Sequence, residues 1–377
     1  MLTIETRQRD FPSLAERVYL NTSAEGIPPL PVIDALAQYG HDKLLGMDGR
    51  ALHEAQWHAT RQEVATLFGL TAEEVGICSC SSEAFNLAAL ALQLTDGDEV
   101  VINDLDFPAG ATPWLLPDCR ATVRLWKSRD GALRTEDLIP LLSPRTRLVS
   151  TSLVSFYNGF RVPLAEIIPA VRQHSPALVA VDVTQALGRI ALDLHDIDLI
   201  ISSTHKWLLA SHGGGLVGVP KSRAAEWTVP AGGWFNLQNA FDANRFERAT
   251  VKPGAASFSV GMPSYAAIYC IAAASKYINS ISVPNIAAQA DPLVRQCLDE
   301  LKRLPVTLLT PADPQTQSGI ISFLHPQAEQ IHRQLHSQNI HVMHHAGRLR
   351  VALHGYNTAA DVERFLEALK QVLNNVS

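Results

Sequence analysis

Leu178-Val-Ala-Val-Asp182 begins the stretch that decides the fold; it continues through Ile200-Ile-Ser-Ser-Thr-His-Lys206 and ends at Gly213-Gly-Gly-Leu-Val-Gly-Val219. Each segment contains the short, nearly continuous apolar run that is typical of a buried strand. Polar residues stand at the ends of these runs: Asp182 closes the first, and Lys206 follows the second. We expect the two side chains to meet at one edge of a sheet.

Similar apolar runs lie before this stretch and alternate with helical patterns. Strand-like runs begin near residues 75, 98 and 147, and helical patterns cover 51–67 and 164–173. This alternation predicts an α/β fold with a mostly parallel sheet that is buried on both faces. Only about a dozen residues, several of them glycine, separate Ser203 from Leu216, which is marginal for a crossover helix. We therefore expect residues 215–219 to pair antiparallel with residues 200–203, so that the sheet is mixed.

The pattern changes after Gly261-Met262-Pro263. Residues 264–280 predict one long helix that links two domains, and shorter strand-like and helical patterns follow. Thr358, with Asp361 three residues later, predicts the start of an amphipathic final helix. We expect a large domain over residues 16–263 and a smaller α+β domain over residues 264–377, with residues 1–15 packing on the smaller one.

The composition is that of an ordinary soluble globular protein, with 47% hydrophobic and 18% charged residues. A net charge of −6 gives no electrostatic reason to expect nucleic acid or an anionic membrane as a partner. No apolar stretch approaches the roughly 20 residues that a membrane span needs, and the N-terminus lacks the apolar core of a signal peptide. Five cysteines, without paired spacing, fit reduced thiols in the cytoplasm.

Two patterns that suggest metal ligands have plainer explanations. Cys78 and Cys80 are too close for the usual zinc pair, and no second pair follows. His332 and His336 are four residues apart on a predicted helix, but the sequence places no third ligand with them, and solvated histidines explain the spacing. We expect no metal site.

Lys206 and Asp182 together match the needs of an aldehyde cofactor. A buried lysine with a lowered pKa forms Schiff bases readily. Pyridoxal phosphate also needs a carboxylate at its ring nitrogen, donors for its phosphate and a group that stacks on its ring. Ser81 and Ser82 stand where a predicted strand meets a helix N-terminus, which is a natural phosphate site. A plain serine cap with Glu83 in the first turn explains that segment equally well.

The spacing Asp182-x-x-Gln185, followed by Ser203-x-His205-Lys206 and a glycine-rich strand, resembles the fold-type I pyridoxal phosphate enzymes of aminotransferase class V. The resemblance runs over nearly the whole chain, from the Tyr19-Leu-Asn loop to the last helix. It implies a large domain with a mostly parallel, mixed sheet between helices, a smaller α+β C-terminal domain, and a homodimer with active sites at the subunit interface. It also implies pyridoxal 5'-phosphate as the cofactor and an amino acid as the substrate.

The resemblance implies a role for each matching residue. Lys206 would bind the cofactor covalently and move the α-proton, Asp182 would hold the ring nitrogen, and Gln185 would contact the ring hydroxyl. Phe107 falls where the family places its stacking ring, and Arg350 matches the arginine that binds the substrate α-carboxylate. The phosphate would be bound by Ser81, Ser82, Ser203 and His205, with backbone help near Glu83. Glu25 and His344 lie in loops that we expect to face the substrate.

The chain also departs from the family pattern. Cysteine desulfurases carry a nucleophilic cysteine shortly before the arginine, but residues 340–350 contain none, which disfavours a persulfide-carrying desulfurase. Phe107-Pro108 replaces the stacking histidine of those enzymes. The Gly-Thr-Pro signature that reaches a neighbouring subunit's phosphate appears here with Met262 in the central position. Cofactor binding is still expected after these changes, but they do not select the reaction.

The sequence therefore predicts a pyridoxal phosphate enzyme that acts on an amino acid by transamination or by β-elimination of the C–S lyase type. The next alternatives are an amino-acid epimerase or racemase, and a cysteine desulfurase that lacks the usual loop cysteine. A non-catalytic relative comes last, because Lys206, Asp182 and Arg350 are all present. A nicotinamide enzyme has little support, because no Gly-x-Gly-x-x-Gly follows a strand.

Overall fold

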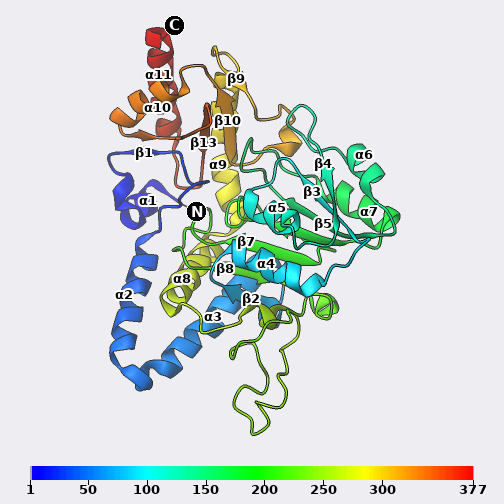
Figure 1. Cartoon of the computed structure of the whole chain (residues 1–377). Helices are drawn as coiled ribbons and strands as arrows, with labels where there is room; N and C mark the ends of the chain where they lie inside the picture. The colour runs from blue at the N-terminus through cyan, green and yellow to red at the C-terminus, as the bar shows by residue number, and fades with distance from the viewer. Residues whose placement is uncertain (1, 377) are drawn as a thin grey trace.

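A seven-stranded sheet forms the centre of the computed structural model, which describes residues 2–376 (Figure 1). The strand order is β2-β8-β7-β6-β5-β3-β4. β8 pairs antiparallel with both of its neighbours, and the other pairs are parallel, so the prediction of a mixed sheet is confirmed. The strands are β2 (Val75–Cys78), β3 (Glu99–Asn103), β4 (Thr122–Trp126), β5 (Thr146–Ser152), β6 (Leu178–Asp182), β7 (Leu199–Ser203) and β8 (Gly215–Gly218).

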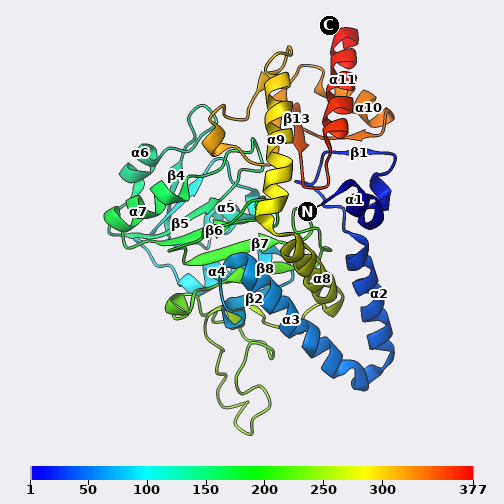
Figure 2. The same ribbon diagram turned by 180° about the vertical axis from the view of Figure 1, so that it is seen from behind.

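Helices cover both faces of this sheet because its strands alternate two apolar sets of side chains. Val100, Leu148 and Ile201 pack on one face against α4 (Ser81–Leu92) and α5 (Pro108–Leu115). Val101, Val179 and Ile200 face the other way, toward α3 (Arg50–Phe68), α7 (Leu164–His174) and α8 (Tyr265–Ile281). Figures 1 and 2 show the two layers from opposite sides.

The C-terminal part builds a second, smaller core around an antiparallel sheet of order β12-β13-β10-β9. Its strands are β9 (Thr307–Leu308), β10 (Ile320–Leu324), β12 (Met343–His345) and β13 (Arg348–Ala352), and its helices are α10 (Ala328–Ser337) and α11 (Ala359–Val376). Thr358 and Asp361 exchange backbone-to-side-chain hydrogen bonds at the start of α11, as the sequence predicts. This architecture confirms the predicted α/β fold, with a large mixed sheet between helices and a smaller C-terminal part of strands and helices.

The long helix predicted over residues 264–280 is α8, and it ends at Ile281. Ser282 has a positive φ of 71° and turns the chain directly into α9 (Val283–Leu301), which runs from the large sheet to the small one (Figure 2). The division at residue 263 remains our proposal for the domain boundary.

The N-terminal segment lies against the C-terminal part. β1 (Val18–Tyr19) pairs in parallel with β11 (Ile340–His341), and Arg7 of α1 (Ile4–Asp10) donates from Nε to the Tyr356 carbonyl at 2.8 Å. Between α1 and the first large-domain strand lies α2 (Leu30–Leu44). The remaining short helices are α6 (Thr135–Leu138), η1 (Pro12–Leu14), η2 (Gly46–Gly49), η3 (Ala72–Glu74), η4 (Ile139–Leu141), η5 (Lys221–Arg223), η6 (Gly254–Phe258) and η7 (Pro314–Thr316). Within residues 2–376, no helix is long and apolar enough to cross a membrane.

Candidate active site

The predicted cofactor residues gather at the carboxyl ends of the parallel strands, where ligands bind in open α/β sheets. Asp182 is the last residue of β6 and Ser203 the last residue of β7, which pairs with β6. Lys206 follows three residues later, and Phe107 comes just after β3. The topology thus brings together residues that lie about a hundred positions apart in the chain.

Lys206 is partly buried, and burial lowers the pKa of its amine. Asp182 opposes that shift, whereas the positive charge of Arg350 adds to it. The amine lies 5.2 Å from the centre of the Phe107 ring. A larger neutral fraction of the amine favours attack on an aldehyde carbon, which is the chemistry that Schiff-base formation needs.

Asp182 is buried, with 7% of its surface exposed, and its Oδ1 accepts a hydrogen bond from the Thr184 amide at 2.7 Å. Burial raises the pKa of this carboxyl, and the Thr184 hydrogen bonds and the Lys206 charge lower it. A cation at its second oxygen would lower the pKa further. Gln185 is held by two contacts: its Nε2 donates to the Ser23 carbonyl, and its Oε1 accepts from the Trp207 indole.

Two serines meet at the N-terminus of α4. Ser81 Oγ lies 2.8 Å from Ser203 Oγ, and Ser81 is the first residue of the helix. Ser82 is exposed beside it. The Glu83 carboxylate turns away and accepts from both the amide and the hydroxyl of Ser79 at 2.6 Å. The side chain of Glu83 thus caps the loop and does not face the site. Glu83 is near the site only through its backbone in the first turn of α4.

His205 does not stand alone at this end of the site. Its ring stacks on that of His212 with a centroid distance of 4.4 Å, and His212 Nε2 lies 3.2 Å from Glu25 Oε1. Burial lowers the pKa of His205 to about 4. The Glu25 loop is fixed against the lysine segment, because the Gly26 amide donates to the His205 carbonyl, and a Cβ at Gly26 would meet the Lys206 carbonyl at 2.0 Å.

These three side chains also form the one group of potential metal ligands in residues 2–376 whose ligand atoms all lie within 4.8 Å of one another. The Glu25 and His212 side chains are 55% and 70% exposed. Exposed ion pairs of this kind form without a metal ion, so the trio by itself gives no reason to expect one.

Arg350 lies on β13, with 3% of its surface exposed, and donates from Nη1 to the Phe156 carbonyl at 2.8 Å. Burial and the neighbouring Arg348 charge lower the pKa of this guanidinium to about 9. His344 is not brought to the same place. It stands opposite Leu349, whose side chain enters the small core, and its ring lies 5.8 Å from that of His332 on α10.

Two residues near the site have no role in the sequence-based assignment. Asp106 accepts hydrogen bonds from the Ser152 amide and the Asn103 side chain, and burial, with a smaller contribution from Asp182, raises its pKa to about 7. Its position three residues after the end of β3 was the available signal. Arg348 is 2% exposed, and its spacing of two residues from Arg350 on a strand was the signal there.

The donor set fits pyridoxal phosphate. Among the described residues the buried Asp182 carboxylate accepts hydrogen bonds only from Thr184 and forms no ion pair, so it can also accept from a protonated ring nitrogen. Lys206 likewise forms no ion pair within residues 2–376. The hydroxyls of Ser81 and Ser203 and the free amides of α4 would hold a phosphate.

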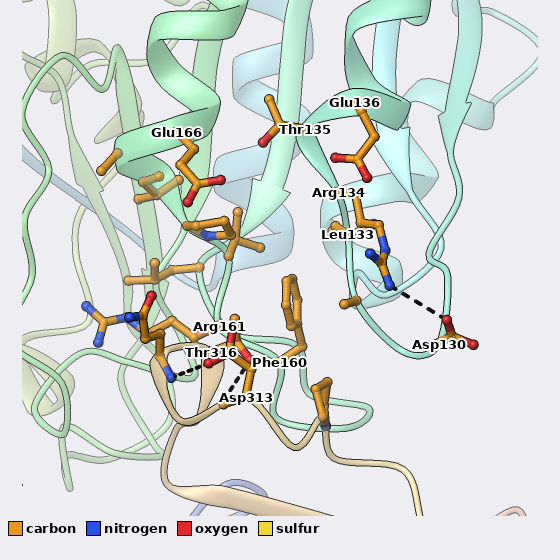
Figure 3. A pocket seen from close by; sticks show the side chains of 18 of the residues that line it. Asp130, Leu133, Arg134, Thr135, Glu136, Phe160, Arg161, Glu166, Asp313 and Thr316 are labelled. Atoms are coloured by element: carbon orange, nitrogen blue, oxygen red, sulfur yellow. Dashed lines mark hydrogen bonds and ion pairs between the residues drawn. The ribbon is translucent and has the colours of Figure 1, made fainter.

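A cavity of about 720 Å³ lies elsewhere. Figure 3 shows it between the loop of Asp130 and Arg134, the start of α7 at Glu166, and the small-domain loop with Asp313. Its side chains carry mixed charges, and Arg134 pairs with Asp130 at 3.6 Å. None of the predicted cofactor residues lines it.

A model of the family described as aminotransferase class-V matches residues 18–365. The chain belongs to that family. The predicted class V identity is thereby confirmed, and with it a pyridoxal phosphate-dependent enzyme of the transferase or lyase kind. Asp182, Lys206 and Arg350 all lie inside the matched segment.

Known proteins of this class V family resemble the chain along most of its length. A cysteine desulfurase from Synechococcus elongatus is 29% identical over 401 aligned residues, which cover 97% of this chain but only 63% of that protein. The structure of an apo cysteine desulfurase from Thermococcus onnurineus NA1 has a TM-score of 0.89 at 22% identity and covers 100% of this chain and 99% of that one. The cystine C-S lyase C-DES, in complex with its product cysteine persulfide, has a TM-score of 0.86 at 23% identity, with 95% and 98% covered.

Proposed function

We propose that this class V protein binds pyridoxal phosphate through Lys206 and acts at the Cα of an amino acid. The observation that carries the proposal is the meeting of Lys206, Asp182 and the Ser81–Ser203 pair at one edge of the sheet. Asp182 would hold the ring nitrogen, Gln185 would lie at the ring hydroxyl, and Phe107 would cover the ring. The phosphate would lie among Ser81, Ser82, Ser203 and His205 at the start of α4.

The chain's own residues would bind the substrate and move its α-proton. Arg350 offers a planar pair of N–H donors that suits an α-carboxylate. Lys206 would take the proton from Cα, because its amine has a lowered pKa and stands over Phe107 at the centre of the site. Bound pyridoxal phosphate supplies an electron sink for the negative charge that develops on Cα.

For the step after proton removal we propose β-elimination of the C–S lyase type. The electron pair at Cα would form a double bond to Cβ, and the sulfur would leave with the electrons of the Cβ–S bond. The support is a missing nucleophile: β12 and β13 are joined by a tight turn at Ala346-Gly347, which has no cysteine. Cys270 and Cys297 are buried, and burial raises the pKa of Cys297 to about 12.

The similarity to a cystine C-S lyase also supports elimination. Transamination is the second candidate, because it begins with the same loss of a proton to Lys206 and ends with its return at another carbon. Epimerisation, and desulfuration without a loop cysteine, follow these two. His344 would serve as a substrate contact only if β12 shifted, since its ring now faces His332.

We also propose a homodimer, with the active site at the subunit interface. Large apolar side chains are exposed at the corner formed by α2, η2 and α3, including Leu44 at 85% and Met47 at 78%. The loop between Phe235 and Val251 projects from the body of the molecule (Figure 1) and exposes Phe241 at 79% and Phe246 at 90%. Monomers rarely expose patches of this kind.

A cytoplasmic location stays a prediction. All five cysteines are free thiols, as that prediction expects.

The cofactor proposal is tested by visible absorbance of the purified protein with added pyridoxal phosphate. We expect a yellow protein whose adduct is fixed by borohydride, and a Lys206→Ala variant that forms no such adduct. Lys252→Ala, at a partly buried lysine that donates to the Phe235 carbonyl, is the matched control and should behave as wild type. A colourless wild-type protein, or an adduct that survives in Lys206→Ala, would contradict the proposal.

The reaction is tested with a panel of L-amino acids, including cystine and cysteine, and assays for keto acid, sulfur product and D-amino acid. Elimination predicts keto acid and ammonia together with a sulfur product, without an added amino acceptor. Formation of keto acid only when an acceptor is present would replace elimination with transamination.

The dimer is tested by light scattering. Met47→Glu should produce monomer, and Leu90→Glu, at an exposed leucine of α4, should not.

A further inference from the structure

Arg348 and Arg350 lie two residues apart on β13, so their side chains leave the same face of the strand. Leu349 and Val351, which alternate with them, enter the core of the small domain. The arginine face therefore looks away from that core. Ser322 of β10 stands directly opposite Arg350, and its hydroxyl donates to the Tyr157 carbonyl in the large domain. Both arginines thus face the large domain across the domain boundary.

The two guanidinium groups are buried without an anion beside them. Arg348 is 2% exposed and Arg350 is 3% exposed, and among residues 2–376 neither pairs with a carboxylate. The Nε of each is buried without a hydrogen-bond partner. Buried charges in proteins are ordinarily paired, because their desolvation is otherwise uncompensated. Two unpaired arginines side by side therefore indicate a place for two negative charges.

Both guanidinium groups lie at the cofactor site. Arg350 donates to the Phe156 carbonyl, and the Arg348 guanidinium lies 5.8 Å from the Phe156 ring and 4.2 Å from the Tyr157 ring. Phe156 packs edge-on against Phe107 at 5.1 Å, and Phe107 lies under the Lys206 amine. One aromatic side chain therefore separates Arg348 from the ring that covers the predicted cofactor.

We infer that Arg348 binds a second anionic group of the substrate, so that the substrate is an amino acid with a second carboxylate. The inference rests on the proposed function, in which Arg350 takes the α-carboxylate. The phosphate of the cofactor would lie among Ser81, Ser203 and His205 at the start of α4, whereas Arg348 contacts Phe156 and Tyr157. Cα atoms two apart on a strand are about 7 Å apart, which suits carboxylates separated by a short chain.

The test measures binding of simple carboxylates to the holoenzyme by calorimetry, so that turnover is not needed. Succinate and glutarate carry two carboxylates, and butyrate carries one at a similar size. We expect succinate or glutarate to bind wild type at least tenfold more tightly than butyrate. Equal affinities would overturn the inference, whether or not any variant folds.

Arg348→Met removes the charge and keeps most of the side-chain volume. It should remove the preference for the dicarboxylates and leave butyrate binding within about threefold of wild type. The loss of one charged contact would change the affinity by about tenfold or more. Arg333→Met, on the exposed face of α10, is the matched control and should keep the preference. A dicarboxylate preference that persists in Arg348→Met would contradict a role for that residue.

Cofactor uptake is recorded by visible absorbance on the same samples. A protein that takes up no pyridoxal phosphate contradicts the proposed function. A protein that takes it up but does not distinguish succinate from butyrate contradicts only the second-anion site. Arg348→Lys, which keeps the charge but loses the planar fork, should bind succinate with intermediate affinity.

Discussion

Asp106 and Asp182 are two carboxyl groups at one edge of the sheet, and each responds to burial by a raised pKa. For Asp106 the value rises from 3.8 to about 7. A carboxyl whose folded pKa lies above its unfolded pKa binds more protons in the folded state between the two values. The contribution of this group to the free energy of unfolding is therefore greatest below about pH 4, and it decreases as the pH rises to about 7.

Asp106→Asn should remove this fall. The asparagine Oδ1 can still accept from the Ser152 amide, so the substitution is mild. Because Asp106 is partly buried rather than fully enclosed, we expect the free energy of unfolding between pH 4 and pH 7 to decline less in the variant by roughly 1–3 kcal/mol. Urea denaturation of the apo-protein across that range measures the difference. Parallel pH profiles for the two proteins would show that Asp106 ionises freely.

The Ser81–Ser203 contact makes a second prediction at this scale. Each hydroxyl would bind phosphate, and each also holds the other in place at 2.8 Å. Ser81→Ala and Ser203→Ala should each weaken the binding of pyridoxal phosphate by about tenfold to a hundredfold, the effect of one lost hydrogen bond to a charged group. Because the two hydroxyls share one contact, the double variant should lose less than the product of the single effects. Equilibrium dialysis of the cofactor measures all four affinities.

Individual residues were predictable where strand topology fixes their position. Asp182 and Lys206 follow apolar runs that pair in one sheet, so their meeting follows from the fold. His344 was not predictable, because a shift of one residue in a strand turns a side chain to the other face, and its pairing with Leu349 decides which face that is. Glu83 was ambiguous for a local reason: the same carboxylate can cap Ser79 or lie near a ligand, and the structure has the cap.

At the scale of elements, the turn between β12 and β13 is strained at one position. Ala346 has a φ of 51° and Gly347 a φ of 72°, which are the two positive values of a type I′ turn. Glycine adopts this conformation without cost, but alanine does not. The turn holds Arg348 at the start of β13, so its geometry bears on the substrate site that we propose.

Ala346→Asn should stabilise the protein, because asparagine adopts positive φ more readily and Asn-Gly is the preferred pair for this turn. We expect a gain of about 0.5–1 kcal/mol in the free energy of unfolding. Gly347→Ala should lose a similar amount, since a Cβ there meets no neighbouring atom within 4 Å and only the backbone strain remains. Urea denaturation of both variants checks the signs, and changes of the same sign would contradict the turn assignment.

Elements were predictable from the sequence where the hydrophobic period is long and has clear ends. The helix over residues 51–67 and the cap at Thr358 agree with α3 and α11 within a residue or two. The run from Arg147 to Phe156 predicted a longer strand than β5, which ends at Ser152. Beyond it the chain folds back, and Val154 bridges Arg161 instead of continuing the sheet. A hydrogen bond from the Ser155 amide to the Phe160 carbonyl and a positive φ of 78° at Gly159 make this reversal, and the Asn158-Gly159 pair was its local signal.

At the scale of the whole molecule, Arg189 joins the two parts of the chain. It follows β6, is 1% exposed, and donates to the Leu353 carbonyl at 2.9 Å and to Asp291 of α9 at 2.7 Å. Both partners lie beyond residue 263. Since β13 ends just before Leu353, the contact also fixes the strand that carries Arg348 and Arg350 relative to the cofactor edge.

Arg189→Met should lower the free energy of unfolding by about 3 kcal/mol, because it removes a buried guanidinium and leaves the Leu353 carbonyl without this donor. It should also weaken substrate binding more than cofactor binding, since Arg350 moves with β13 and the phosphate site does not. Arg295→Met, at an exposed position of α9, is the control and should change neither quantity. Equal losses in both ligands would indicate general unfolding instead.

The pairing of β1 with β11 has a consequence for how the chain assembles as it is synthesised. Val18 pairs with Ile340, and Arg7 donates to the Tyr356 carbonyl, so these residues find their partners only after more than 300 further residues have been made. Domains generally fold as units, beginning with those made first. The strands of the large sheet, which end at Gly218, can pair before residues 340–356 have been made. The pairing of β1 with β11 therefore forms after the large sheet in a chain that folds as it is synthesised.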